Sequence, residues 1–590
     1  MAVPSACGIC QGPVEGHLRG RSQAATPGAF SPTCHRPGEH GELERCRWCG
    51  TVHQPSLPAG DELSGLYRAM DDDAYLVEEA GRRATAGRLL DLVGAQVPGG
   101  RLLDVGCGHG LLLDEARRRG FATTGLELSA TAARHARDVL GLDVREATLA
   151  EHEACAEGPH DAIVLVDVLE HLDDPVGALD ACVRLLAPGG VLCLATPDPG
   201  SPVARAAGAR WWGYLPAHAY LLPRRTLREL VAARGLVISH DGPLVRTFTA
   251  GYWLAGLAER GGPLGRAFGA IARRRIARRP LTLSLGDERV VLAHRVAVRR
   301  APAPLMSARG RAERVLVVLP AHNAAATVGQ VAREMPTDAA DAALLVDDAS
   351  TDATTEAALR AGFDVLRHPA NRGYGANQKS CYVRAALDGV DVVVMVHADN
   401  QYDPGLVPAI TAPVLAGRAD VVIGSRLLED RAILGGMPRW KWIGNRALTG
   451  IENRAFRRSY SEYHTGYRAF SVDFLRSVAF LRNSDGFVFD QEIFAQAVAR
   501  GARVEEVAIP TRYFLEASSV SFRTSVAYGL RTLRVLARFR LAERGRPWAP
   551  LLPPAAGLAP DPQERRPPAR PRVDTTARPA PATADSEPIV

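Results

Sequence analysis

The chain has 590 residues, more than one hydrophobic core normally organises, so we expect two or three domains. Its formal net charge of +6 is small for this length and its basic residues are spread widely, which argues against nucleic acid as a partner. No apolar run reaches the roughly 18 residues of a membrane-spanning helix, and the N-terminal residues lack the basic and apolar regions of a signal peptide, so we expect a cytoplasmic protein.

The first segment, residues 1–60, contains two Cys-x-x-Cys pairs. Each pair places two thiolates on a tight turn near a glycine, and two such turns supply the tetrahedral sulfur ligands that zinc favours. The ligands of this structural Zn²⁺ would be Cys7, Cys10, Cys46 and Cys49. Cys34 and His35 lie between the pairs and could replace one ligand. The alternative is a redox pair or unpaired thiols. We therefore predict a small zinc ribbon.

The next segment, 61–300, contains a short apolar strand, a glycine-rich turn and an amphipathic helix. The glycines of the turn are Gly106, Gly108 and Gly110. They let the backbone approach a ligand closely. Asp104 ends the strand before the turn, and Glu127 ends the following strand, where a carboxylate can bind two ribose hydroxyls. This order predicts a nucleotide-type cofactor site.

The motifs DVGCGHG, HDAIVLVDVLEHLDDP and LLAPGGVLCLATPDP resemble those of class I S-adenosylmethionine-dependent methyltransferases, roughly from residue 63 to 300. The resemblance implies a Rossmann-like domain. It implies cofactor contacts for Asp104, Gly106, Gly108, Gly110, Glu127 and Asp167. Asp167 would lie beside the methionine end of the cofactor. His218 precedes a substrate-side helix and would be a base or a substrate contact, or else a histidine without catalytic duty.

The position of the two cysteine pairs ahead of this domain resembles the architecture of sugar C-methyltransferases. This architectural match does not identify a substrate. The fusion of two modules in one chain is the reason to expect that the methyl acceptor is a sugar or a related small molecule.

Residues 301–313 combine proline, alanine and arginine without apolar periodicity and are predicted to form a linker. From 314 to 545 strands and helices alternate, which predicts a mostly parallel sheet with ligands along one edge. The residues expected on the nucleotide-donor side are Pro320, Asn323, Asp347, Asp348 and Arg372. The two aspartates follow a buried strand and could recognise the base and ribose of a nucleotide.

An apolar strand over 392–396 runs directly into polar side chains. In an extended chain His397, Asp399 and Gln401 would point the same way and form a cluster of oxygen and nitrogen atoms able to hold a divalent cation. The alternative is a strand followed by a turn at Asp403 and Pro404.

The motifs LPAHN, VDDASTDAT, NRGYG, HADNQYDP and FVFDQE stand in the order found in family 2 glycosyltransferases, and this resemblance covers about residues 315–540. It is strongest to the branch that contains dolichyl- and polyprenyl-phosphate sugar synthases. The resemblance implies the GT-A fold, a nucleotide-sugar donor, a lipid-phosphate or glycan acceptor, and inversion at the transferred sugar. Asp347 and Asp348 would contact the nucleoside. Asp399 and Gln401 would bind Mg²⁺ or Mn²⁺ on the diphosphate.

Two features refine this assignment. His397 stands where the family usually has an acid, and imidazole is a better ligand for Mn²⁺ than for Mg²⁺. Asp490 and Glu492 lie where an inverting transferase needs a carboxylate to deprotonate or orient its acceptor. Asp490 is the first candidate and Glu492 the second. The alternative is that one of these acids only favours a helix N-terminus.

Near the end of the transferase segment Leu530, Leu533, Leu536 and Phe539 recur at helical spacing, with arginines on another face. Such a helix can lie peripherally on the inner face of an anionic membrane, and packing against the transferase core explains the same pattern. Residues 546–590 are rich in proline, alanine and charge and are predicted to be disordered.

The sequence thus predicts an α/β protein with a zinc ribbon, a Rossmann-like methyltransferase domain and a GT-A glycosyltransferase domain. We expect a bifunctional enzyme of cell envelope glycan synthesis whose two modules modify the same glycan or sugar. The alternative is a single active glycosyltransferase in which the methyltransferase-like part is a binding or scaffolding module.

Overall fold

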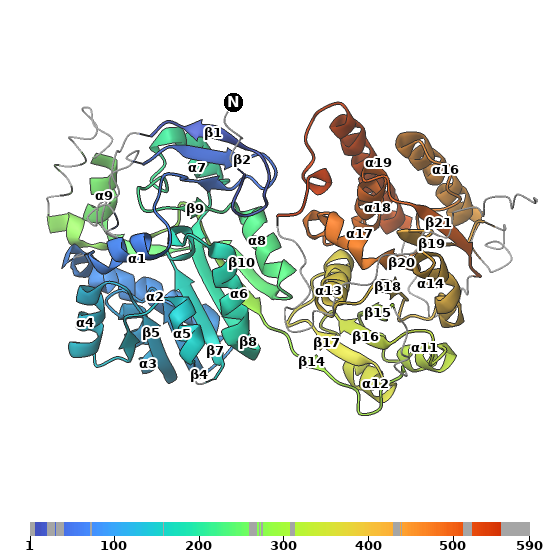
Figure 1. Cartoon of the computed structure of the whole chain (residues 1–590), viewed down its shortest axis with the longest axis horizontal. Coiled ribbons are helices and arrows are strands. Elements are labelled where there is room, and N and C mark those ends of the chain that lie inside the picture. The colour runs from blue at the N-terminus through green and yellow to red at the C-terminus, as the bar shows by residue number, and fades with distance from the viewer. Residues whose placement is uncertain are drawn as a thin grey trace, which may run out of the picture.

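The computed structural model describes residues 6–20, 30, 40–70, 73–156, 158–258, 268, 270, 272, 275–306, 313–428, 437, 439–510 and 522–555. Two α/β bodies lie side by side, and each is built around its own sheet (Figure 1). The predicted fold class is therefore confirmed. No helix among these residues is long and apolar enough to cross a membrane.

A small N-terminal sheet covers one end of the first body. Its strands, in the order β1-β2-β3-β9, are β1 (Val14–Leu18), β2 (Leu43–Cys46), β3 (Val52–His53) and β9 (Tyr220–Leu221). The strand β9 comes from the segment assigned to the methyltransferase domain, and the buried Trp211 of that segment packs with Leu43 and Val52. The N-terminal lobe, formed by this small sheet, therefore extends beyond the boundary predicted at residue 60. Its sheet includes β9, and its core includes Trp211.

The first body has a seven-stranded sheet in the order β10-β13-β8-β7-β4-β5-β6. Its strands are β4 (Gly100–Val105), β5 (Phe121–Leu126), β6 (Val144–Arg145), β7 (His160–Val166), β8 (Leu186–Pro197), β10 (Val237–Pro243) and β13 (Glu288–His294), and a separate pair is formed by β11 (Arg246–Thr249) and β12 (Pro280–Leu283). Strands β4 to β8 are parallel, and β13 runs antiparallel to β8 and β10. Ligands are therefore expected beyond the carboxyl ends of β4, β5 and β7.

Helices cover both faces of this sheet (Figure 1). They are α1 (Gly60–Arg68), η2 (Asp73–Glu78), α2 (Glu79–Gly94), α3 (Leu111–Arg118), α4 (Ala130–Asp138), α5 (Leu149–Cys155), η3 (Leu169–His171), α6 (Pro175–Leu185), α7 (Pro202–Ala207), η4 (Gly208–Arg210), α8 (Arg224–Ala233), α9 (Ala250–Ala258) and η5 (Arg275–Arg278). Two buried clusters, one on each face, hold the sheet between these helices.

The second body has an eight-stranded sheet in the order β14-β17-β16-β15-β18-β20-β19-β21. Its strands are β14 (Val298–Arg299), β15 (Val315–Ala321), β16 (Ala342–Asp347), β17 (Asp364–Arg367), β18 (Val392–Met395), β19 (Val421–Ser425), β20 (Arg468–Ser471) and β21 (Val504–Ala508). Strands β15 to β18 are parallel, as expected, while β20 is antiparallel to β18 and β19. The strand β14 was assigned to the methyltransferase segment but pairs with β17, so this body begins before the predicted linker.

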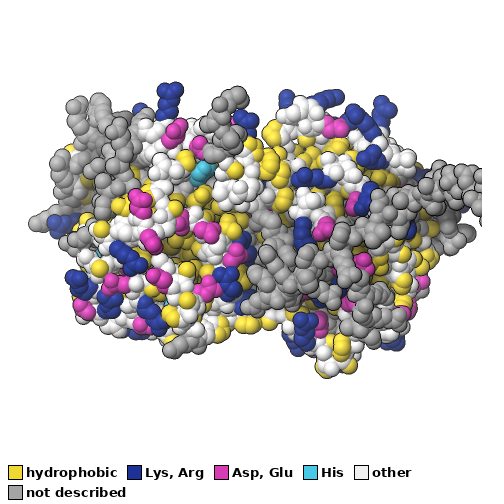
Figure 2. Space-filling model, viewed as in Figure 1, with side chains coloured by type: hydrophobic (Ala, Val, Ile, Leu, Met, Phe, Trp, Pro, Cys, Tyr) yellow, Lys and Arg dark blue, Asp and Glu magenta, His cyan; other side chains and the backbone are white. Residues whose placement is uncertain are grey.

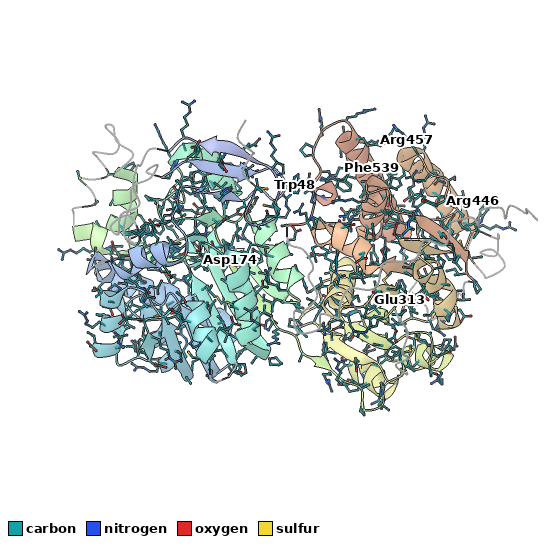
Figure 3. The ribbon with its side chains drawn as sticks, in the orientation of Figure 1. Trp48, Asp174, Glu313, Arg446, Arg457 and Phe539 are labelled. Carbon is teal, nitrogen blue, oxygen red and sulfur yellow. The ribbon has the colours of Figure 1, made fainter. Side chains whose placement is uncertain are left out.

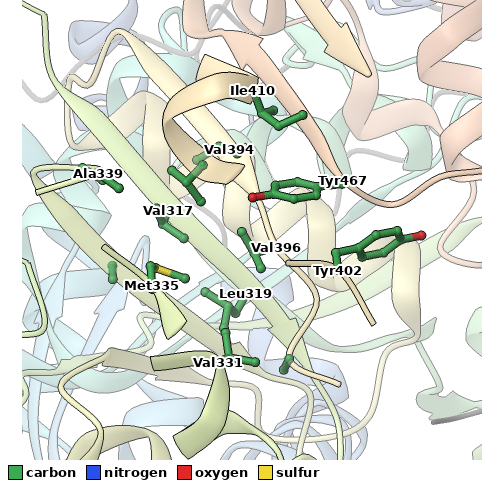
Figure 4. Close-up of a cluster of buried hydrophobic side chains, with 14 of the residues drawn as sticks. Val317, Leu319, Val331, Met335, Ala339, Val394, Val396, Tyr402, Ile410 and Tyr467 are labelled. Atoms are coloured by element: carbon green, nitrogen blue, oxygen red, sulfur yellow. The ribbon is translucent and has the colours of Figure 1, made fainter. Parts of the chain in front are cut away.

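The helices of the second body are α11 (Val328–Glu334), α12 (Thr354–Arg360), α13 (Tyr374–Leu387), η6 (Pro404–Leu406), α14 (Val407–Leu415), α16 (Arg439–Phe456), α17 (Val472–Ser477), η7 (Phe480–Arg482), α18 (Phe489–Ala499), α19 (Phe522–Glu543) and η8 (Ala549–Leu551). Figure 4 shows how the core forms: Val317 of β15 and Val394 of β18 pack with Met335, beyond the end of α11. Such β-branched strands, buried on both faces, are typical of parallel sheets.

The expectation of disorder from residue 546 is wrong for the first ten residues. Trp548 is buried in the second body, and Gln496 Nε2 donates to the Pro550 carbonyl over 2.8 Å. Ala555 is buried against the first body, where its backbone N donates to Glu229 Oε1 over 2.6 Å. The proline-rich composition hid these contacts, because single apolar residues make them without any periodic pattern. Residues 556–590 lie outside the described residues.

Candidate active sites and a cysteine cluster

The two cysteine pairs meet in the N-terminal lobe. The sulfur atoms of Cys7, Cys10, Cys46 and Cys49 all lie within 4.8 Å of one another. A tetrahedral zinc site with Zn–S bonds of about 2.3 Å would separate its sulfurs by about 3.8 Å. The Sγ atoms of Cys7 and Cys49 are 3.8 Å apart, and the backbone N of Trp48 donates to Cys46 Sγ over 3.4 Å. The cluster therefore fits zinc. Cys34 and His35 lie outside the described residues.

The glycine-rich turn joins β4 to α3 at the expected sheet edge. A Cβ at Gly106 would lie 2.6 Å from Val168, and one at Gly110 would lie 2.7 Å from Leu142, so close packing requires both glycines. A Cβ at Gly108 would meet only Tyr75, at 3.9 Å, so this residue faces open space. The turn thus holds its shape by packing and exposes its middle.

Both predicted acids lie beside this turn. The Glu127 carboxylate accepts hydrogen bonds from the backbone N of Gly108 (2.7 Å) and of Ser129 (2.8 Å). Asp104 is buried below it, and burial together with the charge of Glu127 raises the pKa of Asp104 well above its usual value. The structure therefore brings Asp104, the three glycines and Glu127 together.

Sequence reasoning missed an aromatic cover over the turn. Tyr75 of η2 stacks on His109 with ring centroids 4.9 Å apart, and the Arg82 guanidinium lies 3.7 Å from the Tyr75 ring centroid. Burial raises the pKa of Tyr75. The segment before α2 therefore covers the glycine-rich turn through Tyr75. The sequence gives no motif for this contact, because a tyrosine in a short 3₁₀ segment carries no periodic pattern.

Asp167 follows β7, where its backbone takes a left-handed conformation with φ of 56°. Both its carboxylate oxygens accept from Arg246 Nη2, at 2.7 and 2.8 Å, and Arg246 also pairs with Glu288. Burial acts to lower the pKa of Arg246, but the two carboxylates raise it well above its usual value. Asp167 therefore lies at the predicted edge and is fixed there by an arginine that the sequence analysis did not single out.

His218 forms a cluster with His171 and Glu170. Their potential ligand atoms all lie within 4.8 Å of one another. His218 Nδ1 lies 2.7 Å from the Gly213 carbonyl and His171 Nδ1 lies 3.2 Å from the Ala217 carbonyl. A carbonyl only accepts, so His218 Nδ1 carries the proton and its Nε2 keeps a lone pair. His171 Nδ1 also lies 2.8 Å from the Tyr67 hydroxyl, which can donate or accept.

Burial keeps this cluster neutral. It lowers the pKa of His218 to about 3 and that of His171 to about 4. Glu170 Oε2 accepts from Thr196 Oγ1 over 2.9 Å, whereas Glu170 Oε1 has no hydrogen-bond partner among the described residues. The two imidazoles and the free carboxylate oxygen could accept a proton or hold a divalent cation.

In the second body, Asp347 and Asp348 lie at the carboxyl end of β16 and organise its loops. Asp347 Oδ1 accepts from the backbone N of Ser350 over 2.8 Å. Asp348 accepts from His368 Nδ1 (2.7 Å) and from the backbone N of Arg372 (2.9 Å) and of Gly373 (2.8 Å). Burial acts to raise the pKa of Asp348, but these donors lower it.

The neighbouring donor-side residues close the same edge. Pro320 lies on β15, opposite Val346 of β16. Asn323 has a φ of 54°, and its Oδ1 accepts from the backbone N of Thr351 over 2.9 Å. The Arg372 side chain lies in a cavity between the two bodies, together with residues of α8. Four of the five predicted donor-side residues thus lie at the expected edge, whereas Arg372 reaches it only through its backbone N, which donates to Asp348.

The geometric reason given for the metal site is wrong. The strand β18 ends at Met395, and the chain then turns through 398–400, with Asn400 in the left-handed conformation at φ of 58°. Side-chain alternation therefore does not carry beyond the strand, because the chain is no longer extended. Asp399 Oδ1 accepts from the backbone N of Gln401 over 3.1 Å. The three predicted ligands share this turn without forming an extended row.

The two predicted parts of the transferase site meet at Tyr374. Its Oη donates to Asp490 Oδ2 over 3.3 Å and lies 3.2 Å from His397 Nε2. Asp490 also accepts from Gln378 Nε2 over 3.0 Å and lies 3.2 Å from Nη1 of the buried Arg468. Tyr374 stands inside the NRGYG motif, but no local pattern distinguishes it from the other residues of that loop.

Glu492 is placed differently from Asp490. Its Oε2 accepts from the backbone N of Ser484, and burial raises its pKa. It therefore supports the loop before α18 and is not among the contacts of Tyr374. Of the two candidate acids, Asp490 is the one that contacts Tyr374.

Comparison with known proteins identifies both bodies by family. A Methyltransferase domain matches residues 77–240, and a Glycosyl transferase family 2 domain matches residues 316–478. An uncharacterized protein of Methanocaldococcus jannaschii is 31% identical over 221 residues, which are 38% of this chain and 90% of that protein.

Other similarities are partial. A ubiquinone biosynthesis O-methyltransferase of Caulobacter vibrioides is 44% identical over 101 residues, which are 16% of this chain and 40% of that protein. One of Xanthomonas campestris pv. campestris is 37% identical over 144 residues, 23% of this chain and 59% of that protein. The chain thus spans about half the length of these methyltransferases. A glucosyl-3-phosphoglycerate synthase structure from Mycobacterium tuberculosis is 18% identical with a TM-score of 0.33, covering 40% of this chain and 86% of that one.

Proposed function

We propose that this chain, which joins a methyltransferase domain to a family 2 glycosyltransferase domain, uses both in the synthesis of one glycan. The glycosyltransferase would pass a sugar from a nucleotide donor to a lipid-phosphate or glycan acceptor with inversion. The methyltransferase would act on a sugar or a related small molecule. The transferase part rests on the contact of Asp490 and His397 through Tyr374, which joins the predicted acceptor side to the predicted diphosphate side. The shared glycan rests on the presence of both domains in one chain.

In the transferase, Asp490 would accept the proton of the acceptor hydroxyl or orient the acceptor for in-line attack. Gln378 and Arg468 hold its carboxylate in place. Asp399 and Gln401 would bind Mg²⁺ or Mn²⁺, and the bound cation would neutralise charge on the departing nucleoside diphosphate. His397 favours Mn²⁺. Asp347 and Asp348 would hold the loops that receive the nucleoside.

In the first domain, Asp104, the three glycines and Glu127 would bind S-adenosylmethionine, which when bound supplies the methyl group. The neutral Nε2 of His218 would accept a hydrogen bond from the methyl acceptor, because a pKa of about 3 makes it a weak base. Arg246 keeps Asp167 at the same edge. The four cysteines would hold a structural Zn²⁺, because their sulfur spacing fits its tetrahedral coordination.

A peripheral membrane contact would suit a lipid-phosphate acceptor. The predicted apolar row of α19 divides in the structure: Leu536 and Phe539 are buried, whereas Leu530 is 64% exposed. Ile443 of α16 is 60% exposed. Figure 3 labels Phe539 on α19, Arg446 on α16 and Arg457 directly after α16. In Figure 2, hydrophobic and basic side chains lie together over the part of the second body where Figure 1 labels α16 and α19. Exposed apolar residues beside arginines favour binding to an anionic surface.

Vesicle sedimentation tests this contact. We expect the full chain to bind vesicles containing anionic lipid, and Leu530→Asp with Ile443→Asp to weaken binding. Binding that both charged variants retain in full would contradict a contact through α16 and α19.

A screen of nucleotide sugars with Mn²⁺ and with Mg²⁺ tests the transferase. We expect hydrolysis or transfer with at least one donor, and a loss of 10²-fold or more in kcat for Asp490→Asn, since a positioned carboxylate contributes about that much. The matched variant Glu492→Gln should lose far less. Equal losses would contradict the choice of base, and full activity of Asp399→Ala with metal would contradict the cation site.

Calorimetric titration with S-adenosylmethionine tests the first domain. Gly108→Val should weaken binding, because it fills the open middle of the turn. Failure of the wild-type protein to bind would favour the alternative that this domain is a binding or scaffolding module. Ala555 packs against this domain, and that contact supports a structural role for the domain without bearing on its catalytic activity.

A further inference from the structure

A cavity of about 590 Å³ lies between the two bodies, and its walls are basic. Such a volume is typical of small-molecule sites. One wall is α8 of the first body, and the other is α13 with the segment 481–485 of the second (Figure 1). The lining cations are Arg224, Arg225, Arg228, Arg372, Lys379, Arg384 and Arg482, against two acids, Glu229 and Asp485.

The helix spacing explains why the cations converge. On α8 the lining residues recur four apart, as at Arg224 and Arg228, so they share one helix face. On α13 the same spacing of four relates Lys379 to Val383 and Ser380 to Arg384. Each helix thus turns a polar face toward the other. The charge belongs to neither domain alone and arises from their juxtaposition.

The two lining acids are already engaged. Glu229 pairs with Arg482 over 2.7 Å, with both side chains almost fully buried. Asp485 pairs with Lys379 over 2.7 Å and lies 3.8 Å from Arg228. Two acids outside the lining pair with further lining cations: Asp241 with Arg224 (2.8 Å) and Arg228 (2.7 Å), and Asp388 with Arg384. The positive charge that no carboxylate offsets therefore rests on the remaining lining arginines.

Arg225 and Arg372 differ from the other lining cations. Within the described part of the chain, neither Arg225 nor Arg372 forms an ion pair with a carboxylate. Although much of the Arg225 surface is exposed, desolvation by the cavity walls and the nearby Arg482 lower its pKa. Burial also lowers the pKa of Arg372, although Asp485 opposes that shift. In addition, Arg482 Nη2 is buried without a hydrogen-bond partner among the described residues. A bound anion would supply the missing acceptors.

The floor of the cavity is apolar and is formed by Leu236, Val296, Leu366 and Leu387. A ligand with a carbon framework would therefore fit better than a bare anion. Guanidinium groups recognise phosphate oxygens through paired hydrogen bonds. We propose that this interdomain cavity binds a small phosphorylated metabolite, with its phosphoryl oxygens on Arg225, Arg228 and Arg372 and its carbon part on the apolar floor.

The cavity adjoins the proposed donor site but is distinct from it. Ser380 lines the cavity, and its Oγ lies 2.8 Å from His368 Nε2, while His368 Nδ1 lies 2.7 Å from Asp348. One histidine thus separates the two sites. A test must therefore separate binding in the cavity from binding of a nucleoside diphosphate at Asp399.

Isothermal titration of the full chain with inorganic pyrophosphate, at low ionic strength and without divalent metal, makes this separation. We expect saturable binding that weakens roughly tenfold in Arg225→Gln, because one charge-assisted contact is lost. Arg225→Lys should retain most of the affinity. Arg225 is exposed and makes no ion pair among the described residues, so these variants should fold. A hexose phosphate and a nucleoside diphosphate, titrated in parallel, show which carbon part the floor accepts.

Two controls make the outcome decisive. Arg205→Gln removes an exposed arginine of α7 outside the cavity and should bind like the wild type. Asp399→Asn alters the proposed donor site and should also bind pyrophosphate normally. Absence of saturable binding, an equal loss in Arg205→Gln, or a loss only in Asp399→Asn would each overturn the proposal. The last result would leave the proposed transferase function standing.

Discussion

At the scale of single residues, the hydroxyl of Tyr374 links the two halves of the transferase site. Tyr374→Phe removes this hydroxyl and keeps the ring. We expect kcat to fall roughly tenfold with little change in KM, since a hydrogen bond to a charged group contributes about 1.5 kcal/mol. Steady-state kinetics with an active nucleotide sugar measures this. Tyr460→Phe, in a separate buried cluster, is the control and should leave kcat unchanged. Equal kcat for both variants would contradict the link.

The buried histidines make stability depend on pH. The pKa is lowered from 6.5 to about 3 for His218 and to about 4 for His171. Below pH 6.5 the unfolded chain therefore binds protons that the folded chain excludes, and stability falls as the pH falls toward 4. The slope approaches about 1.4 kcal/mol per pH unit for each histidine. Urea unfolding at pH 7 and pH 5 measures this.

A variant tests whether this pH dependence of stability comes from His218. His218→Gln removes one titrating group, so its free energy of unfolding should fall less between pH 7 and pH 5 than that of the wild type. His240→Gln, on the edge strand β10, serves as the matched control and should keep the wild-type slope. The assignment fails if the two variants lose stability equally.

The sequence predicted the residues that follow strands better than those that cover them. Asp104, Glu127 and Asp348 could be placed because a strand that ends in an acid beside a glycine turn marks a ligand edge. Tyr75 and Arg246 could not be placed. Each makes its contact with a segment distant in the sequence, Tyr75 with His109 and Arg246 with Asp167, and no local pattern records such a pairing.

At the scale of elements, the cysteine cluster is expected to hold together a sheet that spans two sequence segments. Metal analysis of the purified chain should find one zinc per cluster, and a chelator should unfold the lobe, because small zinc-bound units rarely fold without metal. β9 pairs with β3, so hydrogen exchange should rise at Tyr220 and Leu221 as well. Cys49→Ser should reproduce the effect, and Cys155→Ser, at an exposed cysteine, should not. Unchanged exchange after complete zinc removal would contradict this coupling.

The shortest strands could not be predicted from the sequence. β9 and β14 each contain two residues, too few for alternation to show, and each pairs with a sheet outside its own predicted segment. Long apolar strands such as β15 were placed correctly, because a buried run predicts a central parallel strand. Strand pairing therefore crosses the boundaries predicted at 60 and 300.

At the scale of the whole molecule, a buried ion pair joins the two bodies. Arg482 and Glu229 are 2.7 Å apart, and their side chains are 1% and 2% exposed. Glu229→Ala leaves a buried guanidinium unpaired, which costs about 3–5 kcal/mol. We expect a matching loss in urea unfolding. The double variant Glu229→Leu with Arg482→Met carries neither charge and should recover most of the loss. A double variant as unstable as the single one would show that the pair does not act through its charge.

The C-terminal segment also bridges the bodies and can be tested by truncation. Removing residues 546–590 deletes the bonds from Arg482 Nη1 to the Ala549 carbonyl and from the Ala555 backbone N to Glu229. Both partners are charged and buried, so we expect easier proteolysis between the bodies and a loss of about 2–4 kcal/mol in stability. Removing only 556–590 spares these bonds, and the proline-rich composition of that stretch predicts no packing. Equal effects of the two truncations would assign the stabilisation to residues beyond 555 and contradict the bridge seen at Ala555.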